Sequence, residues 1–146
     1  MLHDLFSAKY ERGTGKPGTY DCKSLFVEVM NRFGNDVKTP DIEIYAIEQV
    51  LAAEARGEYP YSEADFNIIQ EELASGKWEK IDEPVEGCAV LMALDPHKPH
   101  VIQHLGVYIG DNKFIHILQD MGVITTKLND RVFARKIRGF YKWKNC

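Results

Sequence analysis

Residues 104–118 read HLGVYIGDNKFIHIL, and this stretch decides the fold. It contains two runs rich in β-branched and aromatic residues, and the Gly-Asp-Asn between them is typical of a tight hairpin turn. Five runs of this composition follow Trp78 and are separated by turn residues: 88–94, 103–109, 113–118, 122–128 and 137–143. The second half of the chain therefore predicts an antiparallel sheet of about five strands.

The first half of the chain predicts helices. In GTYDCKSLFVEVMNRFG, residues 18–34, apolar residues recur at helical spacing, with Asp21 as the N-cap and Gly34 as the stop. Two further helices are predicted over 39–57 and 62–76, each with a capping residue at its start and a glycine at its end. Helices followed by an antiparallel sheet indicate an α+β fold, with the N-terminal helices packed on the C-terminal sheet. We expect a single domain over residues 1–146.

Composition and charge exclude several classes of partner. The formal net charge is −4 and no long basic run is present, so we expect neither nucleic acid nor an anionic membrane surface as a partner. The amino end, MLHDLFSAKYERG, lacks the basic and apolar regions of a secretory signal, and no 18-residue apolar run occurs. We therefore expect no signal peptide, and synthesis in the cytoplasm. Three widely spaced cysteines make neither a disulfide framework nor a paired zinc motif.

Cys22 directly follows the predicted cap, in the first turn of a helix. The unpaired N–H groups and the helix dipole at that position stabilise a thiolate. A lone cysteine on a helix is more often a small buried apolar residue, so the reading as a nucleophile needs a proton-transfer partner, a role most often taken by histidine.

Of the five histidines, only His104 and His116 fall inside predicted strands. The hairpin loop decides whether they can cooperate. A two-residue turn would place them on opposite faces, whereas a three-residue loop over 110–112 or an equivalent bulge would place them on one face, diagonally about 7–8 Å apart. In the second arrangement one imidazole can orient the other, as in a cysteine triad.

The segments YDCKSLF and HLGVYIGDNKFIHIL together resemble the NlpC/P60 family of papain-like cysteine peptidases. That family reads Asp-Cys-Ser-Gly at the nucleophile, then His-Val-Gly-Ile-Tyr-Ile-Gly and, after a turn, Phe-Ile-His. The resemblance implies Cys22 as nucleophile, His104 as general base and then acid, and His116 as the orienting member. YERG, starting at Tyr10, is similar to the family's Tyr-x-x-Gly segment, which implies that Tyr10 lines the substrate site.

Two further stretches, GKWEKIDEPVEGCAVLMAL and VITTKLNDRVFARKIRGFYKW, resemble peptidases of phage and prophage tail tips. The family resemblance implies an endopeptidase for peptidoglycan stem peptides, of the D-glutamyl–diamino-acid type, that needs no metal or cofactor. The likeness to the tail-tip branch implies a place in a virion tail acting on the cell wall, with other phage tail proteins as partners.

The chain departs from the family pattern at two points. Lys23-Ser24 replaces the Ser-Gly after the nucleophile, and Cys88 replaces the acidic residue after Pro-x-x-Gly. Lys23 and Ser24, together with the capping residue Asp21, are therefore candidate substrate contacts. A buried cysteine at the second point can serve packing alone.

Three other readings stay open. His97, His100 and His104 with Cys88 contain enough ligands for zinc, but prolines interrupt the segment and the spacing is atypical. A catalytically silent tail-assembly or wall-binding module of the same fold is a second reading. The third is an amidase or acyltransferase acting on another substrate, because fold and triad determine the reaction type better than the acyl group.

Overall fold

The structure is a computed structural model, and it describes most of the chain outside one long central segment. The described residues are 2–11, 18–37, 72–94, 97, 99, 102, 104–118 and 121–144. The helix predicted over 39–57 lies outside them, as does most of the one predicted over 62–76. Of the latter, residues 72–74 are helical and Gly76 has a φ of +81°, which agrees with its predicted place at the helix end.

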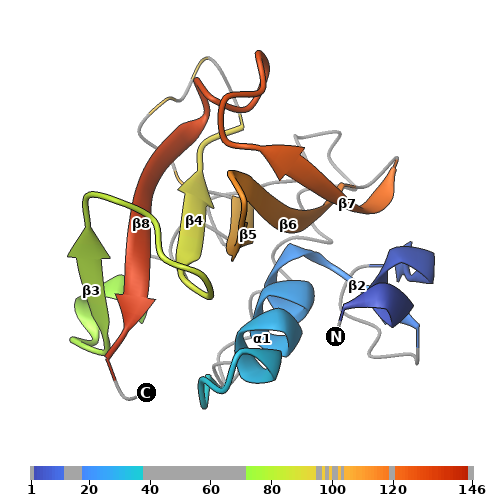
Figure 1. Cartoon of the computed structure of the whole chain (residues 1–146), viewed down its shortest axis with the longest axis horizontal. Coiled ribbons are helices and arrows are strands. Elements are labelled where there is room, and N and C mark those ends of the chain that lie inside the picture. The colour runs from blue at the N-terminus through green and yellow to red at the C-terminus, as the bar shows by residue number, and fades with distance from the viewer. Residues whose placement is uncertain are drawn as a thin grey trace.

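Six antiparallel strands form the main sheet. They are β3 (Trp78–Ile81), β4 (Ala89–Met92), β5 (His104–Gly110), β6 (Lys113–Leu118), β7 (Gly122–Lys127) and β8 (Ile137–Trp143). Their order across the sheet is β3-β8-β4-β5-β6-β7, which Figure 1 shows from one edge to the other. With a helix packed on this sheet, the fold is α+β, as predicted. The five predicted strands correspond to β4 to β8.

The strand that the prediction missed is β3, which pairs with β8 and forms one edge of the described sheet. Its sequence, Trp-Glu-Lys-Ile, has two exposed charged residues at its centre and lacks the apolar texture used to find the others. Charged side chains are typical of edge strands because they prevent pairing with another chain. A second, two-stranded parallel sheet joins β1 (Lys9–Tyr10) to β2 (Thr19–Tyr20), and these strands are too short to produce a pattern.

Helix α1 (Cys22–Arg32) begins and ends as predicted. Asp21 is its N-cap and forms a capping box, in which the Ser24 N–H donates to Asp21 Oδ1 and the Asp21 N–H donates to Ser24 Oγ, both at 2.9 Å. At the other end Gly34 has a φ of +86° and donates its N–H to the Asn31 carbonyl, a Schellman-type ending. No helix among the described residues is long and apolar enough to span a membrane.

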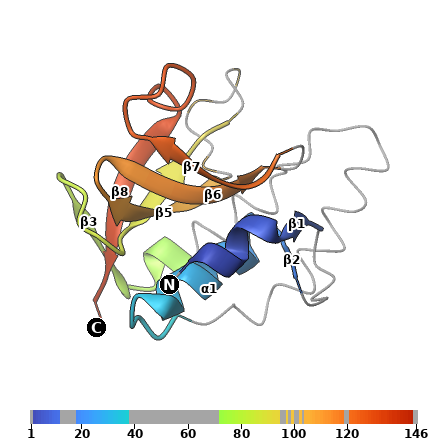
Figure 2. The ribbon, with the colours of Figure 1, turned by 45° about the vertical axis from the view of Figure 1, so that its right-hand side comes forward.

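Helix α1 packs on β5 and β6, and the 3-10 helix η1 (His3–Ser7) packs on β7. Figures 1 and 2 show both helices on one side of the sheet. The Arg32 guanidinium links them, since it contacts Asp4 of η1 at 2.6 Å and Glu28 of α1 at 2.9 Å. The largest fully buried side chains come from η1, α1 and the central strands: Leu5, Leu25, Val29, Met30, Val90, Met92, His104, Phe114, Ile115, His116 and Ile117.

Candidate active site

The β5–β6 hairpin contains both a two-residue turn and a bulge. Asp111 and Asn112 have φ values of 55° and 62°, as a type I′ turn requires. Val107 pairs with Ile115 and Tyr108 with Phe114, but the register then shifts, and Gly110 pairs with Lys113. One extra residue therefore sits on β5. The loop is the shorter alternative, and the bulge restores the parity that a three-residue loop would have supplied.

His104 and His116 consequently share one face of the sheet. His104 Nε2 and His116 Nδ1 are 2.8 Å apart, which is a direct hydrogen bond between the two rings. This confirms the predicted relation between the strands, in which the two histidines lie diagonally on neighbouring strands.

A third side chain continues the hydrogen-bond chain. His116 Nε2 lies 2.8 Å from Oγ1 of Thr126 on β7, whose register partner on β6 is Phe114. Thr126 was not among the predicted site residues, because neither its residue type nor its place in Gly122–Lys127 distinguishes it from an ordinary strand threonine. What distinguishes Thr126 is a polar side chain on the buried side of its strand. This can be recognised only once the register of β7 with β6 is known.

The histidine pair is buried, and aromatic rings lie against it. Both imidazoles are 0% exposed. The ring of Phe133 meets the His116 ring edge-on, with centroids 4.9 Å apart, and the Phe114 ring lies 4.7 Å away. Asp130 Oδ1 accepts hydrogen bonds from the N–H groups of Val132 and Phe133, which holds the turn that carries Phe133.

Burial determines the charge of both rings. It lowers the pKa of His116 from 6.5 to about 4, although the Asp130 carboxylate acts in the opposite direction. It also lowers the pKa of His104 well below 6.5, and the positive charge that His116 can carry adds to this effect. Both rings are therefore neutral at neutral pH, and a neutral imidazole is the form that a general base requires.

Cys22 is the first residue of α1, and it is 4% exposed. The direction of α1 along the sheet follows from its other end. Phe33 lies against Gly87, where an added Cβ would be 3.3 Å from the Phe33 Cβ, and the Gly87 N–H donates to the Tyr108 carbonyl of β5. The C-terminal end of α1 thus lies beside the Tyr108 end of β5.

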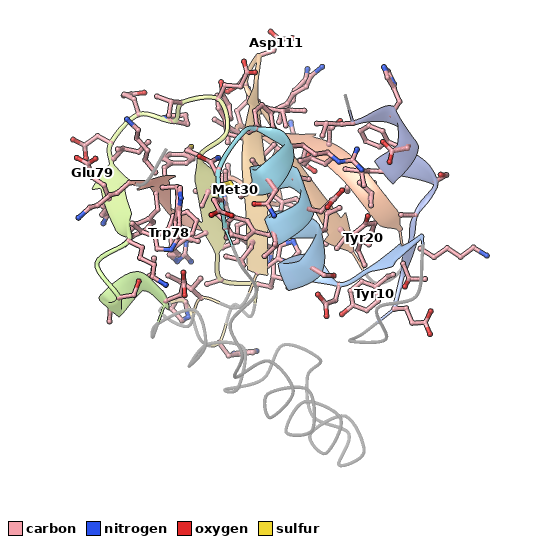
Figure 3. All side chains as sticks on the ribbon, turned by 90° about the horizontal axis from the view of Figure 1, so that it is seen from below. Tyr10, Tyr20, Met30, Trp78, Glu79 and Asp111 are labelled. Atoms are coloured by element: carbon pink, nitrogen blue, oxygen red, sulfur yellow. The ribbon has the colours of Figure 1, made fainter. Side chains whose placement is uncertain are left out.

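An 11-residue helix is about 16 Å long, and β5 runs about 13 Å from Tyr108 back to His104. The start of α1 therefore lies toward the His104 end of β5. Figure 3 agrees: Met30, near the end of α1, lies toward the Asp111 turn, and Tyr20, two residues before α1, lies toward the opposite end. The Cys22 sulfur and His104 Nδ1 are expected to meet at this end, and their separation stays a prediction.

The other candidate residues surround the start of α1. Tyr10 pairs with Tyr20 in the small parallel sheet, and Figure 3 shows these two side chains close together. Asp21 is 5% exposed, and its carboxylate caps the helix. Ser24 contributes both its hydroxyl and its N–H to the capping box. For these residues and for Lys23, in the first turn of α1, contact with a substrate stays a prediction.

The zinc reading receives no support from the described residues. Among them, no group of three or more His, Cys, Asp and Glu side chains is placed to hold a metal ion. His104 is fully buried against His116 while His97 is exposed, and His100 lies outside the described residues. Cys88 is 1% exposed, and burial raises the pKa of its thiol, which is typical of a packing cysteine.

A cysteine at a helix start and a buried, hydrogen-bonded histidine pair on the neighbouring strands are the residue types of a papain-like cysteine triad. Comparison with known families is specific: the NlpC/P60 family model matches residues 7–142, and the chain belongs to that family. Members of this family are generally cysteine peptidases that act on cell-wall peptides. No protein with a curated description matches the chain significantly.

Two solved structures share the fold. NlpC2 from Trichomonas vaginalis is 18% identical with a TM-score of 0.59, and the match covers 95% of this chain and 42% of that one. NlpC1 from the same organism is 19% identical with a TM-score of 0.56, and the match covers 97% of this chain and 42% of that one. The chain thus spans less than half the length of each of these proteins. At these identities the likeness concerns the fold alone.

Proposed function

We propose that this protein is a cysteine endopeptidase of peptidoglycan stem peptides, with Cys22 as nucleophile and His104 as general base. The observation that carries the proposal is the hydrogen bond between the neutral, buried rings of His104 and His116 at the end of β5 toward which α1 begins. Family membership supplies the class of substrate.

In the proposed reaction the Cys22 thiol transfers its proton to His104 Nδ1, and the thiolate attacks the carbonyl carbon of the scissile amide. Backbone N–H groups at the start of α1 and the helix dipole stabilise the negative oxygen that forms. The protonated His104 then gives its proton to the leaving amine. Water, deprotonated by His104, hydrolyses the thioester and regenerates the thiol. His116 keeps the His104 ring oriented through the Nε2–Nδ1 hydrogen bond throughout these steps.

The bond proposed for cleavage lies between D-glutamate and a diamino acid, and Tyr10, Asp21, Lys23 and Ser24 are the proposed substrate contacts. The sequence likeness to tail-tip peptidases favours a virion tail as the place of action, after synthesis in the cytoplasm and with other tail proteins as partners. Immunogold labelling of purified virions would test this location. Label distributed over capsids, or absent from the particles, would reject it.

Digestion of purified sacculi with the wild type and with Cys22→Ala tests the activity. Diaminopimelate-containing and lysine-containing walls should be used in parallel, with fragments identified by mass spectrometry. We expect new fragments ending in D-glutamate and new free amines on the diamino acid with the wild type only. Fragments independent of Cys22, or none from either wall, would overturn the proposal.

The same experiment separates the two alternatives. Stem peptides released whole from the sugar would indicate an amidase. Retention of the protein on insoluble sacculi with no fragment released would indicate the catalytically silent wall-binding module.

A further inference from the structure

The hydrogen-bond chain does not end at His116. Its Nε2 lies 2.8 Å from Thr126 Oγ1. His116 and Thr126 are 0% and 8% exposed, so this hydroxyl is the hydrogen-bond partner that solvent would supply to an exposed imidazole. Within the described part of the chain, this is the one hydrogen bond of the Thr126 side chain. A hydroxyl can either donate or accept, whereas each neutral imidazole carries one proton on one nitrogen. The three groups therefore have two possible proton arrangements.

Only one of these arrangements is compatible with catalysis. When His104 takes the thiol proton on Nδ1, it carries protons on both nitrogens, and its Nε2–H donates to His116 Nδ1. His116 Nδ1 must then be bare, so the His116 proton sits on Nε2. That Nε2–H points at Thr126 Oγ1, which must accept it.

We propose that Thr126 is a positioning residue: its hydroxyl accepts the His116 Nε2–H, and so keeps His116 in the tautomer that leaves His104 Nδ1 basic. This inference rests on the proposed function. It assigns to β7 a part in the reaction, through the hydrogen bond that joins Thr126 to His116.

Removal of the Thr126 hydroxyl should reverse the direction of donation in the hydrogen bond between His104 and His116. Valine has the shape of threonine but no acceptor, so Thr126→Val would leave a His116 Nε2–H buried without a partner. Nothing then holds the His116 proton on Nε2, and we expect it to move to Nδ1, where it donates to His104 Nε2. His104 must in turn carry its own proton on Nδ1, and this nitrogen can no longer take the thiol proton.

The test compares Thr126→Val and Thr126→Ser with the wild type, and uses Thr125→Val as the matched control. Thr125 is the exposed neighbour of Thr126 on the opposite face of β7. Long-range 1H–15N spectra of histidine-labelled protein at pH 7.5 report the tautomer, and kinetics on the released-fragment assay give kcat and KM.

We expect His116 to carry Nε2–H in the wild type, Thr126→Ser and Thr125→Val, and Nδ1–H in Thr126→Val. In Thr126→Val, kcat should fall about 10- to 100-fold with KM unchanged, by analogy with the residues that orient metal-ligating histidines. A wild type with Nδ1–H on His116, or Thr126→Val with the wild-type tautomer and kcat, would overturn the inference.

Two provisions keep the test decisive. If Thr126→Val does not fold by circular dichroism, Thr126→Ala replaces it, because alanine lacks the hydroxyl and adds no bulk. An unchanged His116 tautomer in that variant would equally overturn the inference. The tautomer is read without substrate, so failure of the wild type to cleave sacculi would reject the proposed function and still leave the role of Thr126 to be decided by the spectra.

Discussion

Gly106 lies between His104 and Tyr108 on the same face of β5, and an alanine at this position should destabilise the protein. An ideal Cβ there would be 2.9 Å from Phe114 Cδ2, 3.1 Å from the Ile115 carbonyl oxygen and 3.3 Å from Met92 Cε. Phe114, Ile115 and Met92 are at most 1% exposed, so none can move outward into solvent.

The magnitude follows from these contacts. Overpacking a well-filled core by one methyl group costs about 1–3 kcal/mol. Replacing glycine by alanine recovers about 0.4–1 kcal/mol, because the unfolded chain loses conformational freedom. The expected net loss for Gly106→Ala is about 1–2 kcal/mol. For a 146-residue chain this corresponds to a fall in Tm of about 3–6 °C.

Thermal and urea unfolding measure this loss, and Gly139→Ala on β8 is the matched control. The Cβ added at Gly139 would make only ordinary contacts, 3.4 Å from Tyr141 Cε2 and 3.7 Å from Lys80 Cε, so that variant should be as stable as the wild type or slightly more stable. Equal stabilities of Gly106→Ala and Gly139→Ala would refute the reasoning.

The same substitution should reduce activity. The added methyl group pushes on the Phe114 ring, whose centroid is 4.7 Å from that of His116.

Phe114→Leu in the Gly106→Ala background should restore part of the lost stability, since it removes the crowded ring atom. If the losses of stability caused by the two single substitutions simply add in the double mutant, the two positions do not interact.

Three further predictions concern the thiol, the histidines and the helix cap. Iodoacetamide should modify Cys22 faster than Cys88, because burial raises the pKa of the Cys88 thiol, and peptide mapping that finds equal rates would contradict this. The folded-state pKa of His116 is about 4 against 6.5 unfolded, so its contribution to stability is present above pH 6.5 and is lost as the pH falls toward 4. The midpoint of urea unfolding should fall over that pH interval, and should fall less steeply in His116→Gln. The same dependence of the midpoint on pH in both proteins would reject the assignment. Asp21→Ala should lower the free energy of unfolding by about 1 kcal/mol through loss of the capping box, and denaturant titration with no change in midpoint would count against it.

The local features of the fold could be predicted from the sequence because each depends on a few neighbouring residues. Apolar spacing, the Asp21 cap and Gly34 were sufficient for the first helix. Runs rich in β-branched and aromatic residues, separated by turn residues, were sufficient for five strands. The edge strand β3 lacked that signal, because two of its four residues are charged and face solvent. The pairing of Cys22 with two downstream histidines as a candidate site also came from residue types at characteristic places.

Whether the two histidines could cooperate was decided only by the tertiary structure. Side chains alternate with a period of two along a strand, so one extra residue reverses the face, and the bulge that supplies it reflects the pairing of β5 with β6. Burial lowers the pKa of His116, and side chains far away in the sequence, such as Phe133, contribute to that burial. The hydrogen bond to Thr126 exists because β7 lies beside β6. The sequence by itself determines which residues can do the chemistry, and three-dimensional packing decides which of them meet and in what state of charge.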